Sequence, residues 1–255
     1  MQFSLNAGKY LQLKDKRDQS DFLVTPKHKN LLRFKSWGRK NWFAPEFDIP
    51  IWESTIDMTL TKQIYKTVKN HKFYRTPPTK FGTPPSENDF WKSYNIFAQS
   101  HSFVEHLKKA IKEQLLLYLD SLNLIGGKIY ALADTDRSFF INGWINNMKK
   151  NEFLNAHAHG IHEHSFISGQ IILSNSILPV GFILPHLSLE YGILYCKNKQ
   201  SALKLFPSYL PHFIPKVSQK ERWTLAFDIF TEDFIKLFKK DIKNPEDPIS
   251  RVVVL

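Results

Sequence analysis

The chain lacks most of the features that mark secreted or membrane-spanning proteins. Its only cysteine is Cys196, which excludes an intramolecular disulfide framework. The first ten residues, MQFSLNAGKY, lack the basic, apolar and small-residue zones of a secretion signal. The most apolar stretch, residues 166–196, is interrupted by prolines and polar residues, so it has no run of about 20 apolar residues that could cross a bilayer. We therefore expect a cytoplasmic protein that does not span a membrane.

Acidic residues are scarce relative to basic ones, and the imbalance is concentrated at one end. The chain has 35 Lys and Arg against 24 Asp and Glu, a net charge of +11. Residues 1–42 contain ten Lys and Arg against three Asp, which is +7 of that total. Two interpretations stay open for this basic, aromatic-bearing segment: a weak contact with a polyanion, or a solvated lysine-rich surface.

The 255 residues, among them 21 Phe, are enough for one elaborated domain. We expect residues 1–44 to form an extension that packs on or flanks the core, and residues 45–255 to form a single domain. Ser54 or Thr55 is expected to cap a helix that ends near residue 70, and a second helix is expected over about 88–122. A proline-rich loop, residues 76–87, separates the two helices.

Beyond residue 127 the pattern changes to short, aromatic or β-branched segments separated by turns, which is typical of a sandwich or barrel. The fold class is therefore α+β, with helices over 55–122, strands over 128–230 and a last helix near 232–241. The expected strands are 128–133, 138–148, 165–173, 189–196, 202–206 and 221–230.

Histidines are concentrated in one short stretch. His157, His159, His162 and His164 lie within eight residues, and His212 follows in a proline-flanked turn between two expected strands. Imidazole is the commonest side-chain metal ligand. Side chains two apart on a strand share a face, so either His157 with His159 or His162 with His164 can face one metal, with His212 as the third ligand. The pattern predicts a metal site, and a pH-responsive loop is the alternative.

A second pattern lies ten residues after His212. Arg222 stands at the start of the next expected strand, and Thr224 lies on the same face. A guanidinium makes paired hydrogen bonds to a carboxylate, and a threonine hydroxyl can add a third. These two residues predict a carboxylate-binding site beside the metal.

These motifs resemble those of the 2-oxoglutarate- and Fe(II)-dependent oxygenases, in particular a bacterial and phage branch of that superfamily. The matching pieces are PIWESTID (50–57), INGWINN (141–147), NAHAHGIHEHSFISG (155–169), LFPSYLPH (205–212) and RWTLAFD (222–228). The resemblance covers about residues 45–230. It implies a double-stranded β-helix, a jelly-roll fold with the metal at its open mouth.

Residue by residue, the resemblance implies that His157 and His212 bind Fe(II) and that His159 takes the third position. It further implies that Arg222 and Thr224 bind the distal carboxylate of 2-oxoglutarate. The implied activity is hydroxylation of a substrate, with conversion of the small-molecule cosubstrate 2-oxoglutarate to succinate and CO2. We expect the substrate lip at the proline-rich loop 76–87, the basic N-terminal segment and the loop after Ile177, and their composition fits a peptide, a metabolite or a nucleic acid.

The sequence departs from the family pattern in ways that leave alternatives open. Most of the superfamily uses Asp or Glu as the third ligand, whereas this chain offers His159, with Glu163 nearby. The spacing to the following Ser-Gly also leaves His162 and His164 as an alternative pair. A tyrosine of the relatives is absent, and Gln170 is its expected substitute in cosubstrate binding. Two other function classes remain: a metal-binding jelly roll without turnover, and a three-histidine dioxygenase that needs no 2-oxoglutarate.

Overall fold

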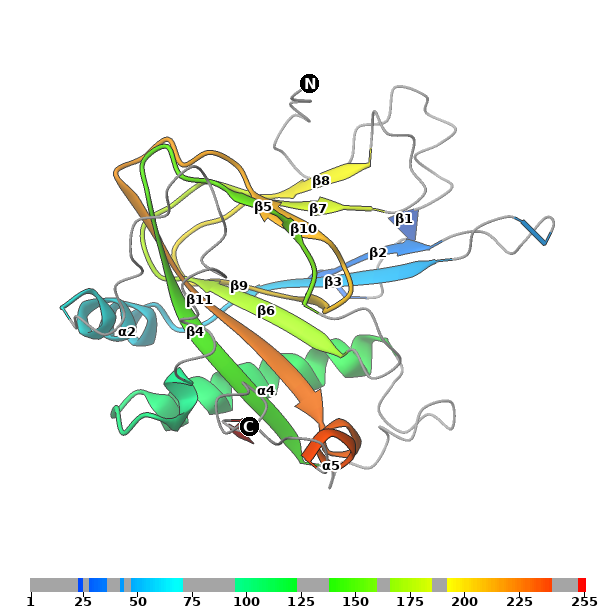
Figure 1. The fold of residues 1–255 in the computed structure, drawn as a ribbon, viewed down its shortest axis with the longest axis horizontal. Coiled ribbons are helices and arrows are strands. Elements are labelled where there is room, and N and C mark those ends of the chain that lie inside the picture. Colours follow the sequence, from blue (N-terminus) through cyan, green and yellow to red (C-terminus); the bar gives the residue numbers. More distant parts are fainter. Residues whose placement is uncertain are drawn as a thin grey trace.

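Two antiparallel sheets stacked face to face form the centre of the molecule in the computed structural model (Figure 1). The structure describes residues 23–24, 28–35, 42–43, 47–70, 95–122, 138–159, 166–184, 192–239 and 252–255. The large sheet has eight strands in the order β1-β2-β3-β9-β6-β11-β4-β12, and the small sheet has four in the order β5-β10-β7-β8. The two sheets form the predicted double-stranded β-helix.

The strands of the large sheet come from all parts of the chain. They are β1 (Leu23–Val24), β2 (Leu31–Lys35), β3 (Asp48–Thr55), β9 (Ala202–Pro207), β6 (Ile167–Ile172), β11 (Glu221–Thr231), β4 (Phe139–Lys149) and β12 (Val253–Val254). The small sheet contains β5 (Leu154–His157), β10 (His212–Ile214), β7 (Val180–Ile183) and β8 (Ile193–Cys196). Most of the expected strands are therefore present, whereas the sequence pattern did not indicate β2, β5, β7, β10 and β12. The expected strand 128–133 lies outside the described residues.

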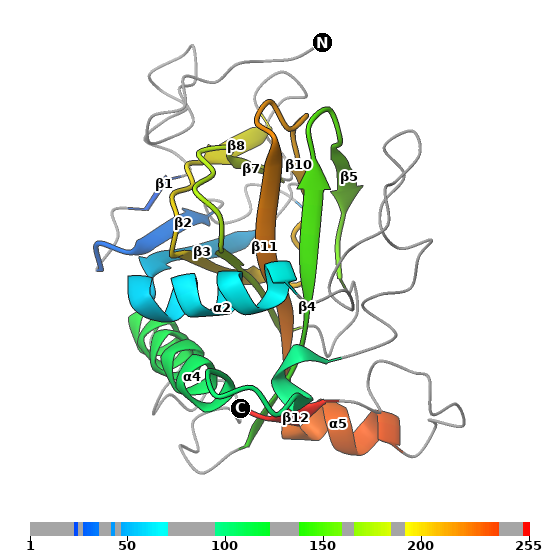
Figure 2. The same cartoon turned by 90° about the vertical axis from the view of Figure 1, so that its left-hand side faces the viewer.

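Two helices cover the face of the large sheet that points away from the small one (Figure 2). The first, α2 (Met58–Asn70), ends where the sequence predicted. Its cap is different, because Ser54 and Thr55 end β3 and the side chain of Asp57 accepts the hydrogen bond from the Leu60 amide at 2.8 Å.

The second helix, α4 (Val104–Ser121), is shorter than the predicted 88–122. The short 3-10 helix η4 (Ile96–Ala98) precedes it, and there the Asn95 side chain caps the Phe97 amide. The last helix, α5 (Glu232–Lys239), directly follows β11, as expected. The proline-rich loop 76–87 lies outside the described residues. In the part of the chain that the structure describes, no helix is both long and apolar enough to cross a membrane.

The core is divided by the large sheet into two clusters. Apolar side chains of α2, α4 and one face of the large sheet form the first cluster, and those between the two sheets form the second. Strand β11 shows how the sequence produces this division, because alternate residues point to opposite faces. Its apolar set packs toward the helices, and its other set, which includes Arg222, Thr224 and Asp228, points between the sheets. The space between the sheets therefore receives polar side chains from a strand that is otherwise part of the core.

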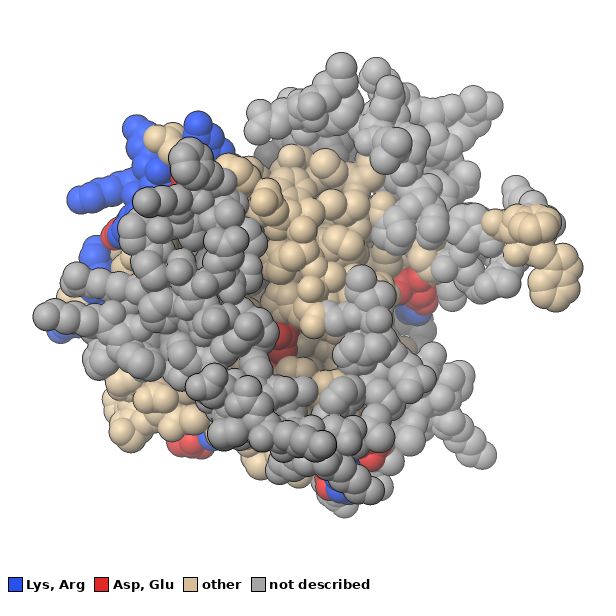
Figure 3. Space-filling view, in the orientation of Figure 1, with Lys and Arg blue, Asp and Glu red and all other residues tan. Residues whose placement is uncertain are grey.

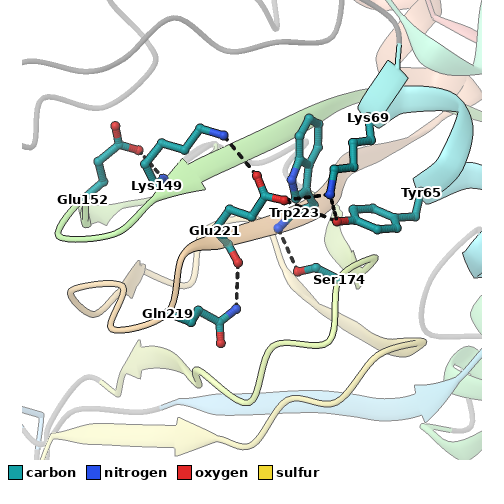
Figure 4. A network of polar contacts seen from close by, with 8 residues as sticks. All are labelled: Tyr65, Lys69, Lys149, Glu152, Ser174, Gln219, Glu221 and Trp223. Carbon is teal, nitrogen blue, oxygen red and sulfur yellow. Dashed lines mark hydrogen bonds and ion pairs between the residues drawn. The ribbon is translucent and has the colours of Figure 1, made fainter.

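Glu221 fastens the start of β11 to its neighbours (Figure 4). Its carboxylate lies 3.1 Å from Lys69 Nζ of α2 and 3.1 Å from Lys149 Nζ of β4. Burial acts to raise the pKa of Glu221, but the hydrogen bonds from Lys69 and Lys149 prevail and lower it to about 2. Two residues further on, Trp223 donates its backbone N–H to Ser174 Oγ at 3.0 Å. These contacts hold the segment that carries Arg222.

Candidate metal and carboxylate site

Three of the predicted histidines meet between the sheets. His157 ends β5, His212 begins β10, and the two residues are direct cross-strand partners. His159 lies two residues beyond β5, where its backbone N–H donates to the Ser208 carbonyl at 2.9 Å. One ring nitrogen from each of the three histidines lies within 4.8 Å of the other two. Because His212 is in a short strand, and not in the predicted turn, its side chain direction is set by the sheet.

The orientation of the three rings follows from what their Nδ1 atoms contact. Nδ1 of His157 lies 2.9 Å from the Asn155 carbonyl, and Nδ1 of His212 lies 3.1 Å from the Leu210 carbonyl. Nδ1 of His159 lies 2.6 Å from Asp228 Oδ1. Carbonyl and carboxylate oxygens only accept, so each Nδ1 carries the proton and each neutral ring has its lone pair at Nε2. The donor set therefore fits a divalent transition metal.

The pKa values of these histidines differ because their surroundings differ. Burial lowers the pKa of His212 well below its usual value, and the two neighbouring histidines lower it further. Burial also lowers the pKa of His157. For His159 burial acts in the same direction, but the charge and hydrogen bond of Asp228 outweigh it and raise the pKa. His157 and His212 are thus neutral near pH 7, the form that binds metals.

Arg222 lies in the same space with part of its hydrogen-bonding capacity unused. The side chain is 1% exposed, and Nη2 donates to Gln170 Oε1 at 3.3 Å. Among the described residues, Arg222 Nε and Gln170 Nε2 have no hydrogen-bond partner. Burial lowers the pKa of Arg222 to about 10, so the guanidinium stays charged at neutral pH. A buried cation with free donors, beside the buried hydroxyl of Thr224, fits a carboxylate.

The histidines and Arg222 line one cavity of about 330 Å³. Its other lining residues are mostly apolar, among them Trp144, Met148, Leu154 and Phe206. The described surface over the small sheet is largely uncharged, whereas Lys and Arg gather where the β4–β5 turn and the β10–β11 connection lie (Figure 3). A cavity of this size can hold a small dicarboxylate next to a metal.

Comparisons with solved structures find similar chains at low sequence identity. A prolyl-4-hydroxylase from Pseudomonas putida is 10% identical, with 71% of this chain and 91% of that chain covered and a TM-score of 0.49. HygX from Streptomyces hygroscopicus, with nickel and 2-oxoglutarate bound, is 10% identical over 71% of this chain and 82% of that one, with a TM-score of 0.46. An oxidoreductase of the 2OG-Fe(II) oxygenase family from Burkholderia pseudomallei is 14% identical over 73% of this chain and 70% of that one, with a TM-score of 0.37. No family model matches the sequence, and a comparison with curated proteins finds no match.

Two residues of the site were missed by sequence reasoning. Asp228 contacts His159 as described above, and Ser168 Oγ donates to the same Asp228 oxygen at 2.6 Å. Both residues stand inside the quoted motifs, but neither was assigned a role. A signal was present, because Asp228 lies six residues after Arg222 on one strand, and an even spacing places both on the same face. The alternative ligands His162, Glu163 and His164 lie outside the described residues.

Proposed function

We propose that the protein is a non-haem Fe(II)- and 2-oxoglutarate-dependent dioxygenase that hydroxylates an as yet unidentified substrate. The observation that carries the proposal is the placement of three histidine ring nitrogens and a buried arginine with an unused Nε in one cavity. A metal site alone would need only the histidines, and a carboxylate site alone only Arg222. Their combination suits a cosubstrate that contacts the metal at one end and Arg222 at the other.

In this proposal His157, His159 and His212 hold the metal, and Arg222, Thr224 and Gln170 hold the distal carboxylate of 2-oxoglutarate. When bound, Fe(II) and 2-oxoglutarate supply the oxidising chemistry, which consumes O2, releases succinate and CO2 and hydroxylates the substrate. The protein contributes orientation, since the histidine rings are fixed by their Nδ1 contacts. The apolar lining limits the access of water to the reacting centre.

The test uses the purified full-length protein loaded with Fe(II) in the absence of O2. Titration with 2-oxoglutarate should produce the visible absorption band of an iron–keto acid chelate, and admission of O2 should then yield succinate even without substrate. Arg222→Ala should weaken 2-oxoglutarate binding by about 30-fold or more, as expected when one partner of a buried charge pair is removed. Arg33→Ala, which removes a partly exposed arginine paired with Asp48, is the matched control. Wild-type protein that shows neither the band nor succinate would refute the proposal.

A second candidate function is favoured by one observation, the presence of a third nitrogen donor where a carboxylate is usual. In a three-histidine dioxygenase that needs no 2-oxoglutarate, O2 consumption would proceed without the cosubstrate and Arg222→Ala would leave it unchanged. The buried charge of Arg222 favours the 2-oxoglutarate-dependent reaction, because no anionic side chain of the described residues pairs with this guanidinium. Measurement of O2 consumption with and without 2-oxoglutarate distinguishes the two.

A further inference from the structure

The three histidines differ in one respect, which is the charge of the group that accepts from Nδ1. His157 and His212 are held by neutral backbone carbonyls, whereas His159 is held by the carboxylate of Asp228 at 2.6 Å. This pair is largely buried, with 12% of the His159 side chain and 17% of the Asp228 side chain exposed. Charge-assisted hydrogen bonds in such surroundings are stronger than neutral ones. His159 is therefore distinguished from the other two by an anionic neighbour.

Asp228 is itself held in place by the large sheet. It lies in the middle of β11, paired in register with Ser168 of β6 on one side and Asn142 of β4 on the other. The fully buried Ser168 donates its hydroxyl to the oxygen that contacts His159. His159 lies outside the regular strands, so this contact ties it to the most extensively paired strand of the fold. The Asp228 carboxylate therefore fixes the orientation of the His159 ring and places a negative charge beside it.

The contact between Asp228 and His159 affects the charge of the metal site. Three neutral imidazoles leave a divalent metal with its full charge, whereas a site with a carboxylate ligand offsets one unit. We infer that Asp228 is a positioning residue that provides, through His159, the negative charge that a directly bound carboxylate would bring to the metal. The Asp228 carboxylate contacts the His159 ring on the side opposite the nitrogen that would bind the metal. This hydrogen bond makes His159 the most basic of the three donors. The inference rests on the metal site of the proposed function.

The experiment measures the affinity of the full-length protein for Co(II) without 2-oxoglutarate, by calorimetry and by the visible absorption of the bound ion. Asp228→Asn keeps the size of the side chain and removes its charge, and it should weaken Co(II) binding by about 10–100-fold. Asp48→Asn removes a carboxylate from the Arg33 pair, away from the cavity, and should leave the affinity unchanged.

A double-mutant cycle separates this role from a merely structural one. In a His159→Asp background the carboxylate binds the metal directly, so Asp228→Asn should change Co(II) affinity little. An equal loss in both backgrounds would show that Asp228 only supports the fold, and no loss in the wild-type background would also overturn the inference. If the asparagine variant does not fold, Asp228→Ser is used in the same cycle.

The design also separates failure of the inference from failure of the proposed function. Wild-type protein that binds no Co(II), or binds it equally well after His212→Ala, has no metal site in this cavity, and both ideas fail. Binding that depends on His212 but not on Asp228 refutes only the inference.

Discussion

Replacing Arg222 by methionine should make the metal-free protein more stable while removing its affinity for 2-oxoglutarate. Arg222 is 1% exposed, and its pKa is lowered from 12.5 to about 10 by burial alone. At about 1.4 kcal/mol for each pH unit, this lowering corresponds to a cost of about 3 kcal/mol for keeping the charge in the folded state. Methionine is unbranched, fills the space of the arginine stem and needs no hydrogen-bond partner.

Part of this cost is offset in the native protein by the contact of Arg222 Nη2 with Gln170 Oε1, which the variant loses. We therefore expect a net gain of about 2 kcal/mol, in the range seen when buried charges are replaced by apolar residues. For a protein of this size the melting temperature should rise by about 4–8 °C. Thermal unfolding of both proteins is measured with and without 2-oxoglutarate and metal. Only the wild type should be stabilised further by the cosubstrate.

The reasoning would be refuted by a variant that is less stable than wild type without ligands and still gains stability from 2-oxoglutarate. Arg33→Met is the matched control, because Arg33 is partly exposed and paired with Asp48 at 2.7 Å. A gain in stability for both variants would indicate a general effect of methionine and not the release of a buried charge.

Three further predictions concern the site and the strands around it. His212→Ala should abolish metal binding in calorimetric titrations, whereas His106→Ala, at an exposed position of α4, should not. Glu221→Gln should lower the free energy of unfolding at pH 7. The difference from wild type should disappear as the pH falls from 4.5 toward 2, because the contacts of Glu221 stabilise the fold only while its carboxylate is charged. Urea unfolding at each pH measures this difference. Gly169→Ala should cost about 1–3 kcal/mol in the same assay, because a Cβ there would overlap the Phe227 ring; unchanged stability would contradict the packing.

The regular elements of this fold could be predicted where their pattern is long. Strands β4 and β11 and the end of α2 follow from alternation and helical spacing over many residues. Strands β5, β7 and β10 have three or four residues each, and their pairing depends on neighbours that are distant in sequence. The start of α4 was placed too early, since the polar side chain of Asn95 caps a 3-10 turn that periodicity does not reveal.

The sequence indicated some residues of the candidate site but not the contacts between them. The types and spacing of His157, His212 and Arg222 pointed to a metal beside a carboxylate, and the structure places all three at one cavity. The contact between His159 and Asp228 joins residues 69 positions apart, so no local pattern contains it. This contact can be identified only once the pairing of the large sheet shows which residues of β11 face the small sheet.

Strand β11 also limits how the protein can change during evolution. It is paired along its whole length with β4 and over six residues with β6, and Arg222, Thr224 and Asp228 alternate along it with core residues. One inserted or deleted residue between Arg222 and Asp228 would turn one of them into the apolar core and an apolar side chain into the cavity. Sequence drift in this strand is therefore confined to substitutions at fixed positions. New activities must arise in the loops and in the lining of the cavity, because the spacing from Arg222 to Asp228 cannot vary.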